Sequence, residues 1–526
     1  MKIGINIIPL RSGKVGGIEI YIRDLISHLL LLDKNNEYVL FTANYNHDTF
    51  DEQSRLKKVL AHSELVNKSK ASKLLSTLPQ GFVQRLRRAK NDKKSISLTD
   101  LIIENKIDLL FCPFGNLEPR PIHIPSVITI HDLQHVYFPE FFSAQELEHR
   151  KKFYPESCQA ATRIIAISNF TKDTIIDNYN IPTKKIRTIW EAQGEQFNSE
   201  ISSIDTGDIK INYNLPDNFA FFPANIWPHK NHVNLILAFA HYKQLTGREK
   251  FLVLTGASLE GRKKIDALIR ELNLQNSVYV LGYIPRHDLL GLYLLADYLV
   301  FPSLFEGFGI PIVEAMACGC PVLASNAASL PEIVGDAGIF FDPKSPKSIV
   351  DSMLYFESSA IIRENLVQKG LARCKVFSYA KTAAETLEVF QEAYNSRETK
   401  DFAFATGIAA DAWLTEPAIF KVVFQKEIKE IQLEGELPGI DLIFPQEVEV
   451  QVNGQIVKKL VIDTTEQFEF SIKGDFVPGK HYAIKIIPSK WFIPNQIGIP
   501  DNRRLAMKIN KFNSVSNNTK TCIWEM

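Results

Sequence analysis

Short apolar runs rich in β-branched residues alternate with amphipathic stretches over roughly residues 1–395. In the stretch 18–30, for example, apolar residues recur at the spacing of one helix face. Apolar strands separated by helices are typical of a parallel sheet that is covered on both faces, so the pattern predicts two tandem Rossmann-like α/β domains. The predicted strands are 2–8, 38–43, 108–113, 126–133, 163–168 and 186–190 in the first domain, and 219–225, 251–256, 278–283, 298–303, 321–326 and 338–343 in the second.

Two interruptions of this alternation predict the domain boundaries. Residues 199–217 are polar and indicate a linker. From about residue 402 a two-residue alternation takes over, as in 448–452, where it runs into the hairpin signal Asn453-Gly454. The last part is therefore predicted to be an all-β sandwich. The predicted domains are 1–200, then 201–398 with a last helix, 380–395, that packs back on the first domain, and finally 402–526.

Charge and composition argue against several classes of protein. The 526 residues include 60 basic and 60 acidic side chains, a balance that does not favour a nucleic-acid partner. The six cysteines are scattered and form no Cys-x-x-Cys pair, so a zinc ribbon is not expected and a reducing, cytoplasmic location is favoured. No apolar run reaches the roughly 18 residues that a spanning helix needs.

The most informative segment is FEGFGIPIVEAMACG, residues 305–319. Pro311 suits the first turn of a helix and Gly319 the position past its end, so a helix is predicted at about 311–318. The amides of 308–310 fall at the start of this helix. Unpaired backbone donors and the helix dipole together make such a position an anion site.

Two carboxylates flank the predicted anion site, Glu306 before it and Glu314 one turn into the helix. Carboxylates repel phosphate, so they suit hydroxyl groups on either side of a diphosphate. One could hold a sugar and the other a ribose. The segment therefore predicts a site for a nucleotide-sugar.

The Glu-x7-Glu pattern with FGIP between the glutamates resembles the retaining family 4 glycosyltransferases of the GT-B fold. The resemblance extends in order over nearly all of residues 1–395 and is closest to mannosyltransferase-like bacterial members, here with an appended C-terminal β-sandwich. The supporting motifs are Gly16-Gly17, HDL (131–133), ISNFT (167–171), PANIWPHKN (223–231), MACGCPVLAS (316–325) and SLPEIVGDAGIFFDP (329–343).

The resemblance implies roles for matching positions of this chain. Glu306 would bind hydroxyls of the donor sugar, Glu314 those of the ribose, and Lys230 the departing diphosphate. His131, at the end of a predicted strand, would lie beside the transferred sugar. The candidate catalytic residues are therefore His131, Lys230 and Glu306. The other positions expected to bind the donor are Gly16, Gly17, Asn225, Gly282, Tyr283 and the amides of Phe308, Gly309 and Ile310.

One segment departs from the family pattern. The family usually has Gly-Arg about five residues before the lysine, where this chain has Ala224 and Asn225. Asn225 can still donate a hydrogen bond, but it carries no charge. His229 is a candidate for partial compensation. The diphosphate would otherwise depend on Lys230 and on backbone amides.

The resemblance implies sugar transfer with retention at the anomeric carbon. No carboxylate nucleophile is evident in the motifs, so front-face attack is expected, with the leaving diphosphate taking the proton of the acceptor hydroxyl. No Asp-x-Asp occurs in the chain, which favours a metal-independent enzyme. No cofactor is expected. GDP-mannose is the favoured co-substrate, and a UDP-sugar is the alternative.

The expected acceptor is a glycan or a lipid-linked sugar in cell-surface polysaccharide synthesis. Residues 68–94 hold nine basic side chains and one acidic one, interleaved with apolar residues. This segment is either a solvated helical excursion or a contact with an anionic membrane at its inner face. Alternative functions are a GT-B nucleotide-sugar epimerase and a catalytically weak glycan-binding relative.

Overall fold

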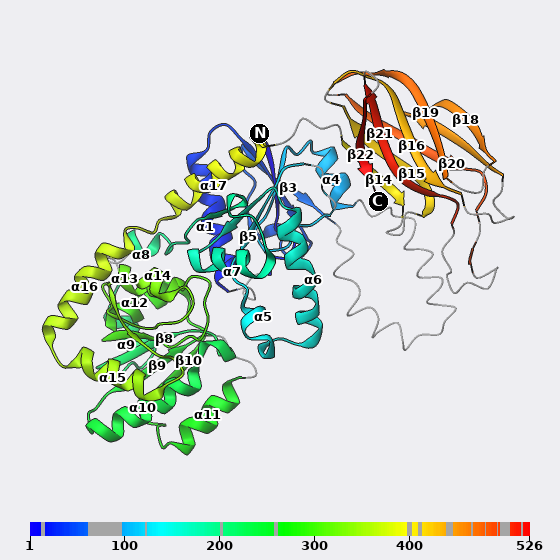
Figure 1. Cartoon of the computed structure of the whole chain (residues 1–526). Helices are drawn as coiled ribbons and strands as arrows, with labels where there is room; N and C mark the ends of the chain where they lie inside the picture. Colours follow the sequence, from blue (N-terminus) through cyan, green and yellow to red (C-terminus); the bar gives the residue numbers. More distant parts are fainter. Residues whose placement is uncertain are drawn as a thin grey trace. The chain divides into compact units, whose positions relative to one another are not determined.

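The chain divides into two compact units, Met1–Ser396 and Arg397–Met526, each of which is described by itself (Figure 1). The computed structural model describes residues 1–11, 16–61, 97–120, 122, 124–199, 204–256, 261–396, 402–408, 413–424, 426–437, 445–463, 467–478, 480–491, 493–494, 505–516 and 519–525. The basic segment 68–94 lies outside the described residues. Within the described residues, no helix is long and apolar enough to cross a membrane.

The first lobe of the larger unit is built on a seven-stranded sheet in the order β3-β2-β1-β4-β5-β6-β7, with every neighbouring pair parallel. Its strands are β1 (Lys2–Asn6), β2 (Glu37–Thr42), β3 (Leu56–Leu60), β4 (Leu109–Cys112), β5 (Ser126–Ile130), β6 (Arg163–Ala166) and β7 (Ile186–Thr188). Its helices are α1 (Gly17–Leu32), α4 (Leu98–Glu104), α5 (Gln134–Tyr137), α6 (Ala144–Ala160) and α7 (Asn169–Tyr179). The short helix α8 (Gln196–Ser199) follows β7 and packs against the second lobe.

The second lobe repeats this plan on a six-stranded parallel sheet in the order β10-β9-β8-β11-β12-β13. Its strands are β8 (Phe219–Pro223), β9 (Phe251–Thr255), β10 (Val278–Gly282), β11 (Tyr298–Phe301), β12 (Val322–Ser325) and β13 (Gly338–Phe341). Its helices are α9 (Thr206–Asn212), α10 (His232–Thr246), α11 (Gly261–Glu271), α12 (Arg286–Leu295), α13 (Ile310–Ala317), α14 (Leu330–Val334), α15 (Pro346–Glu357) and α16 (Ala360–Cys374). The prediction of two parallel α/β sheets is thus confirmed.

The predicted linker at 199–217 was wrong in part, because α9 (Thr206–Asn212) lies within it. Asp205 caps this helix by accepting from the backbone amides of Gly207 and Asp208 at 2.8 and 3.3 Å. Its one buried residue, Ile209, packs against Gly291 of α12. A single apolar anchor in a polar sequence leaves no periodic signal. The edge strand β3 was also missed, since its sequence LKKVL puts two lysines at its centre.

The last helix of this unit, α17 (Tyr379–Asn395), returns to the first lobe. Its Phe390 ring lies 5.1 Å from that of Phe111 in β4, in an edge-to-face arrangement. Arg187 at the end of the first-lobe sheet forms ion pairs with Glu388 and Glu392 of the same helix. The chain therefore crosses between the lobes a second time just before α17.

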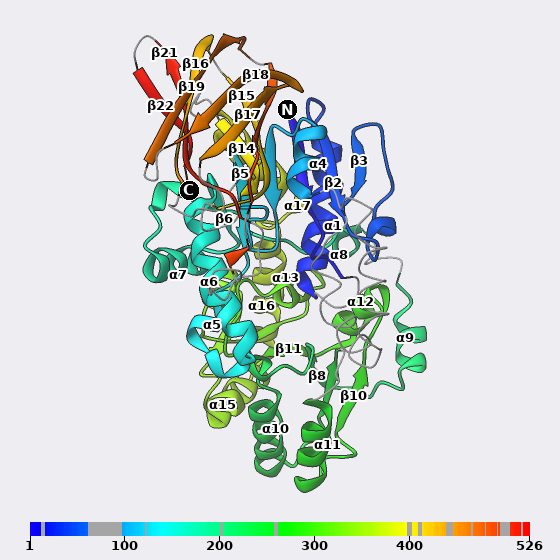
Figure 2. The ribbon, with the colours of Figure 1, turned by 90° about the vertical axis from the view of Figure 1, so that its right-hand side faces the viewer.

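The smaller unit consists of two antiparallel sheets, one five-stranded (β14-β15-β20-β17-β18) and one four-stranded (β19-β16-β21-β22). Figure 2 shows that this unit is built of strands. Both sheets contribute to one apolar core, in which Phe420 and Phe512 have ring centroids 4.7 Å apart. Trp413 and Trp491 pack against this core. The strands are β14 (Phe402–Ile408), β15 (Leu414–Val423), β16 (Ile428–Glu436), β17 (Gln446–Val452), β18 (Gln455–Ile462), β19 (Gln467–Phe476), β20 (His481–Pro488), β21 (Lys508–Ser516) and β22 (Thr519–Glu525).

Candidate functional site

The loop between β11 and α13 carries the first half of the candidate site. It ends at Gly309, the N-cap of α13, whose φ of 105° is in the left-handed region that favours glycine. Ser329 fixes the loop by donating its hydroxyl to the carbonyl oxygens of Glu306 at 2.9 Å and Phe308 at 3.3 Å. Helix α13 begins at Ile310, one residue before the predicted start. Its first-turn amides have no partner inside the helix, so they can bind an anion there.

Lys230 and Glu306 meet in an ion pair at the mouth of this loop. Lys230 Nζ lies 2.5 Å from Glu306 Oε1, with both side chains largely buried. The following residue, Asn231, is in the left-handed conformation and holds the turn by donating to the carbonyl oxygens of Pro302 and Pro343. Burial alone would raise the pKa of Glu306, but the ammonium of Lys230 outweighs it and lowers that pKa.

Glu314 lies deeper, on the buried face of α13, and is only 4% exposed. Tyr293 donates its hydroxyl to Glu314 Oε2 at 2.9 Å, and Arg286 Nη2 lies 3.8 Å from Oε1. Burial raises the pKa of this carboxyl in spite of these partners. Arg286 also lies 3.6 Å from Asp24 of α1, so it links Glu314 to the first lobe. Neither Arg286 nor Asp24 was expected, because both lie outside the recognised motifs.

Replacing each glutamate with neutral glutamine should therefore change the melting temperature of the protein in opposite directions. Glu314→Gln is expected to raise the melting temperature of the donor-free protein at pH 7. The raised folded-state pKa of Glu314 means that its ionisation costs stability as pH rises through that value. Glu306→Gln is the matched control and should lower the melting temperature, since the lowered pKa of Glu306 contributes stability above its unfolded value. Thermal unfolding of both variants at pH 7 is the measurement, and a fall for Glu314→Gln would contradict this account.

Glycines allow the two lobes to approach each other closely near the start of α13. A Cβ on Gly17 at the start of α1 would lie 3.4 Å from the Ile310 side chain, so the two helix N-termini face each other. Gly16 precedes it with a φ of 57° and open space around its Cβ position. A Cβ on Gly307 would lie 1.8 Å from the carbonyl oxygen of His131. The backbone of the second-lobe loop thus touches the end of first-lobe strand β5.

His131 follows β5 and is held at both ring nitrogens. Nδ1 lies 3.1 Å from Glu191 Oε1 and Nε2 lies 2.9 Å from the carbonyl oxygen of Pro113. Tyr21 of α1 packs edge-on against the imidazole at 5.1 Å. Burial disfavours the charged ring, but Glu191 and the Pro113 carbonyl outweigh burial and raise the pKa of His131. Glu191 was missed, although it directly follows the predicted strand 186–190.

Removing the charge of Glu191 should reverse this effect. Glu191→Gln is expected to bring the pKa of His131 below its ordinary value of 6.5, because burial then acts with little opposition. The raised pKa stabilises the wild-type fold below about pH 6.5, and this stabilisation is lost as pH rises through the folded-state value. An NMR titration of the His131 ring protons measures the shift. An unchanged His131 titration in the variant would show that Glu191 does not control the charge of the ring.

The remaining predicted donor residues lie at the carboxyl ends of β8 and β10. Ala224 and Asn225 follow β8, where their backbone comes so close to Gly256 that a Cβ there would lie 2.3 Å from the Ala224 oxygen. Gly282 has a φ of 78° with open space beside it, and Tyr283 is 74% exposed. Among the described residues, no hydrogen bond or ion pair joins Tyr283 to Lys230, Glu306 or Glu314.

His229 does not supply the charge that Asn225 lacks. Burial, with the neighbouring Lys230 as a second cause, lowers the pKa of His229 to about 4. The ring is therefore neutral at pH 7 in this structure. Among the described residues, no group of three or more His, Cys, Asp or Glu side chains is arranged to hold a metal ion.

Comparisons with known proteins cover the same two lobes. A family model described as Glycosyltransferase Family 4 matches residues 15–191, and one described as Glycosyl transferases group 1 matches residues 205–373. O-antigen chain mannosyltransferase B of Escherichia coli is 31% identical over 267 residues, which are 51% of this chain and 70% of that protein. The serotype-specific mannosyltransferase WbdA of Escherichia coli is 32% identical over 255 residues, which span only 31% of its length.

Solved structures share the fold of the two lobes. Sucrose-phosphate synthase from Thermosynechococcus elongatus has a TM-score of 0.59 at 19% identity and covers 75% of this chain and 100% of its own. Anabaena Alr3699/HepE in complex with UDP and glucose has a TM-score of 0.53 at 18% identity, with coverages of 74% and 100%. Because these structures are only 19% and 18% identical to this chain, they show only that the fold is shared. Membership of the family rests on the family models and on the 31% identity to mannosyltransferase B.

Proposed function

We propose a function from the premise that this chain belongs to the family 4 glycosyltransferases of the GT-B fold. The proposed reaction transfers mannose, with retention, from a nucleotide diphosphate sugar to a glycan or lipid-linked acceptor. The observation that carries the proposal is the α13 N-terminus, with Lys230 and Glu306 at its mouth and Glu314 one turn inside. Mannose is favoured by the names of the relatives, which are O-antigen chain mannosyltransferases. GDP-mannose is the favoured donor.

In the proposed site, the diphosphate occupies the start of α13. Lys230 exchanges its ion pair with Glu306 for the phosphate oxygens, and the freed Glu306 accepts hydrogen bonds from hydroxyls of the sugar. Glu314 takes the ribose hydroxyls. A lysine and a set of helix-terminal amides stabilise the charge that develops on the leaving group.

The proposed reaction is a front-face displacement. The bond between the anomeric carbon and the diphosphate oxygen breaks, and a bond to the acceptor oxygen forms on the same face. The acceptor proton passes to the departing diphosphate. His131, held by Glu191 and the Pro113 carbonyl, is proposed to lie beside the sugar. Glu191 and the Pro113 carbonyl raise the pKa of His131 and fix the orientation of its ring there.

The donor is tested by thermal shift with GDP, UDP, ADP, GDP-mannose and UDP-glucose. A ligand that binds only the folded protein stabilises it by about 2.7 kcal/mol at 100 times its dissociation constant. We expect GDP and GDP-mannose to raise the melting temperature more than the uridine compounds do. A larger shift with UDP would assign the donor to the uridine class, and no shift with any nucleotide would overturn the proposal.

Metal independence is a further part of the proposal. Lys230 and the α13 amides supply the charge stabilisation that Mg²⁺ or Mn²⁺ gives other glycosyltransferases. Transfer should therefore continue unchanged in EDTA. Activity abolished by EDTA and restored by Mn²⁺ would refute this part alone.

The proposed setting is cell-surface polysaccharide synthesis on the cytoplasmic side of a membrane. It rests on the O-antigen relatives and on the basic composition of 68–94. Flotation with anionic liposomes at low salt tests the membrane contact. Protein that stays with the soluble fraction would remove the contact from the proposal.

A further inference from the structure

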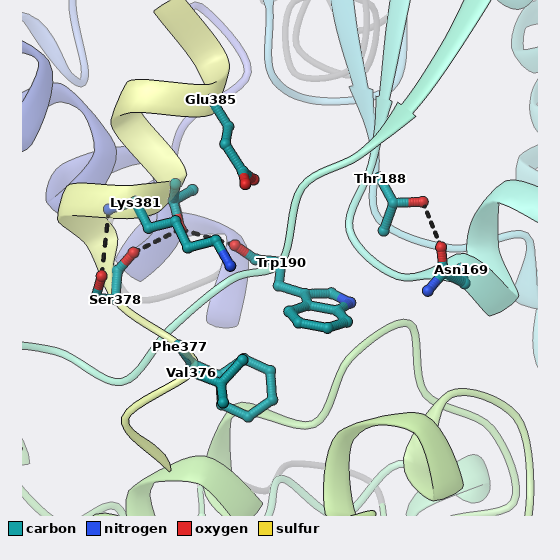
Figure 3. Close-up of a pocket in the computed structure, with 9 residues that line it drawn as sticks. Asn169, Thr188, Trp190, Val376, Phe377, Ser378, Lys381 and Glu385 are labelled. Carbon is teal, nitrogen blue, oxygen red and sulfur yellow. Dashed lines mark hydrogen bonds between the residues drawn. The ribbon is translucent and has the colours of Figure 1, made fainter. Parts of the chain in front are cut away.

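A cavity of about 270 Å³ lies where the chain crosses between the two lobes (Figure 3). One wall is the segment after β7, with Trp190, and the α7 start at Asn169. The opposite wall is the segment from Val376 into the first turns of α17, with Lys381 and Glu385. None of these residues belongs to the donor site described above.

The indole of Trp190 is fixed rigidly in this cavity. Its Nε1 donates to Glu332 Oε1 at 2.7 Å, and the same carboxylate accepts from the backbone amides of Asn169 and Phe170 at 2.9 and 3.1 Å. Thr382 of α17 donates its hydroxyl to the Trp190 carbonyl oxygen at 2.7 Å. An aromatic ring held from both lobes is a preorganised surface, which loses little freedom when a ligand packs on it.

Two charged side chains of α17, Lys381 and Glu385, line the cavity. Lys381 Nζ lies 5.6 Å from the indole centroid, and Glu385 follows one helical turn later. Neither side chain has a hydrogen bond or ion pair with another side chain in the part of the chain that the structure describes. Figure 3 shows both on the α17 side of Trp190, with Thr188 and Asn169 across from them.

The balance of these groups selects the ligand class. The charges of Lys381 and Glu385 are opposite, and so are those of Glu332 and Arg373, which contact the Trp190 indole, so the cavity has no excess positive charge to attract a phosphate or a nucleotide. An ammonium, a carboxylate and the Thr188 hydroxyl offer both donors and acceptors to a neutral polyol. The half-buried indole, against which Phe377 and Arg373 also pack, offers its remaining apolar surface to the C–H groups of a pyranose ring.

From this combination we propose that the Trp190 cavity is a second glycan site, which binds a neutral hexopyranose unit of the acceptor or product chain. The ligand class rests on the proposed function, since a glycan is the substrate that a polysaccharide glycosyltransferase handles. The cavity is also connected to the reaction centre through the backbone, because Trp190 is followed by Glu191, which holds His131. A sugar in the cavity therefore contacts the segment that positions the histidine.

The test is calorimetric binding of an α-linked mannotetraose to the full-length protein without a donor. Lys381→Gln and Glu385→Gln keep strong helix formers at an exposed and a half-buried position of α17, so they should leave the fold intact. Each is expected to weaken binding about tenfold, the effect of losing one hydrogen bond to a charged group. Lys347→Gln with Asp351→Asn, an exposed i,i+4 pair on α15, is the matched control and should bind like the wild type.

The outcomes separate this inference from the proposed function. Wild-type affinity in both α17 variants, or no tetraose binding by a protein whose melting temperature still rises with GDP, overturns the second site and leaves the donor site standing. Weaker GDP binding in Lys381→Gln would assign the cavity to a nucleotide and also overturn the inference. No response to either ligand would refute the proposed function as well.

Discussion

Replacing Lys230 with alanine should reduce mannosyl transfer at saturating donor by about 10²–10³-fold, the effect of deleting one preorganised donor at a developing oxyanion. The ammonium of Lys230 lies at the mouth of the α13 N-terminus, where it can move from Glu306 to a diphosphate. Asn225 and the neutral His229 leave no second side-chain cation in this segment to take its place. Steady-state turnover measures the loss.

The control variants separate charge from packing. Lys230→Gln can still donate a hydrogen bond to Glu306 but carries no charge, so it should lose nearly as much turnover as Lys230→Ala. Lys347→Ala, on exposed α15, should keep wild-type turnover. Near-normal turnover in both Lys230 variants, with the fold intact, would show that the leaving group is stabilised elsewhere.

Gly307→Ala should have the second large effect. A Cβ at this position would lie 1.8 Å from the carbonyl oxygen of His131, so the second-lobe loop and the end of β5 must separate by more than an ångström. A displacement of that size between the group beside the sugar and the diphosphate site is expected to reduce the transfer rate about 10²-fold. The substitution should lower mainly kcat, because Glu314 and Lys230, which are proposed to bind the donor, both lie in the second lobe and keep their positions relative to each other.

Gly370→Ala is the matched control for this substitution. Gly370 lies in α16, where a Cβ would make an ordinary contact of 3.4 Å with Met316. This variant should keep its activity and unfold at or above the wild-type temperature, since alanine favours the helix. Wild-type kcat in Gly307→Ala would show that the close approach of the two lobes in this structure is not needed for transfer.

The two-lobe architecture could be predicted from the sequence because both sheets are parallel and buried on both faces. Each strand is then a continuous apolar run between helices, as at β8 and β11. This apolar pattern is absent from elements that are only partly buried. Edge strand β3 carries two lysines, and α9 buries only Ile209, so neither has the apolar pattern of a core element.

The donor side of the site could be predicted for a local reason. Glu306, Gly309 and Glu314 lie within one loop and the helix that follows, where glycine, proline and glutamate occupy positions with a defined geometry. Lys230 is distant in sequence, and it was identified only through the family resemblance. The structure shows that its ammonium reaches Glu306.

The missed residues are those whose role depends on contacts between distant parts of the chain. Glu191 reaches His131 within the first lobe across 60 positions of the chain, while Arg286 of the second lobe links Glu314 with Asp24 of α1. Glu332 likewise caps α7 and holds Trp190 from the second lobe. Such contacts follow from how distant segments pack in the folded chain, which no local pattern of one sequence encodes.

The most direct test of the central claim is a crystal structure of the full-length protein with GDP bound. We expect a diphosphate oxygen within hydrogen-bonding distance of Lys230 Nζ and of the Gly309 or Ile310 amide, with the ribose hydroxyls on Glu314. Lys230 should then have left Glu306. A nucleotide bound elsewhere, with the Lys230–Glu306 pair intact and Glu314 still paired with Tyr293, would contradict the account.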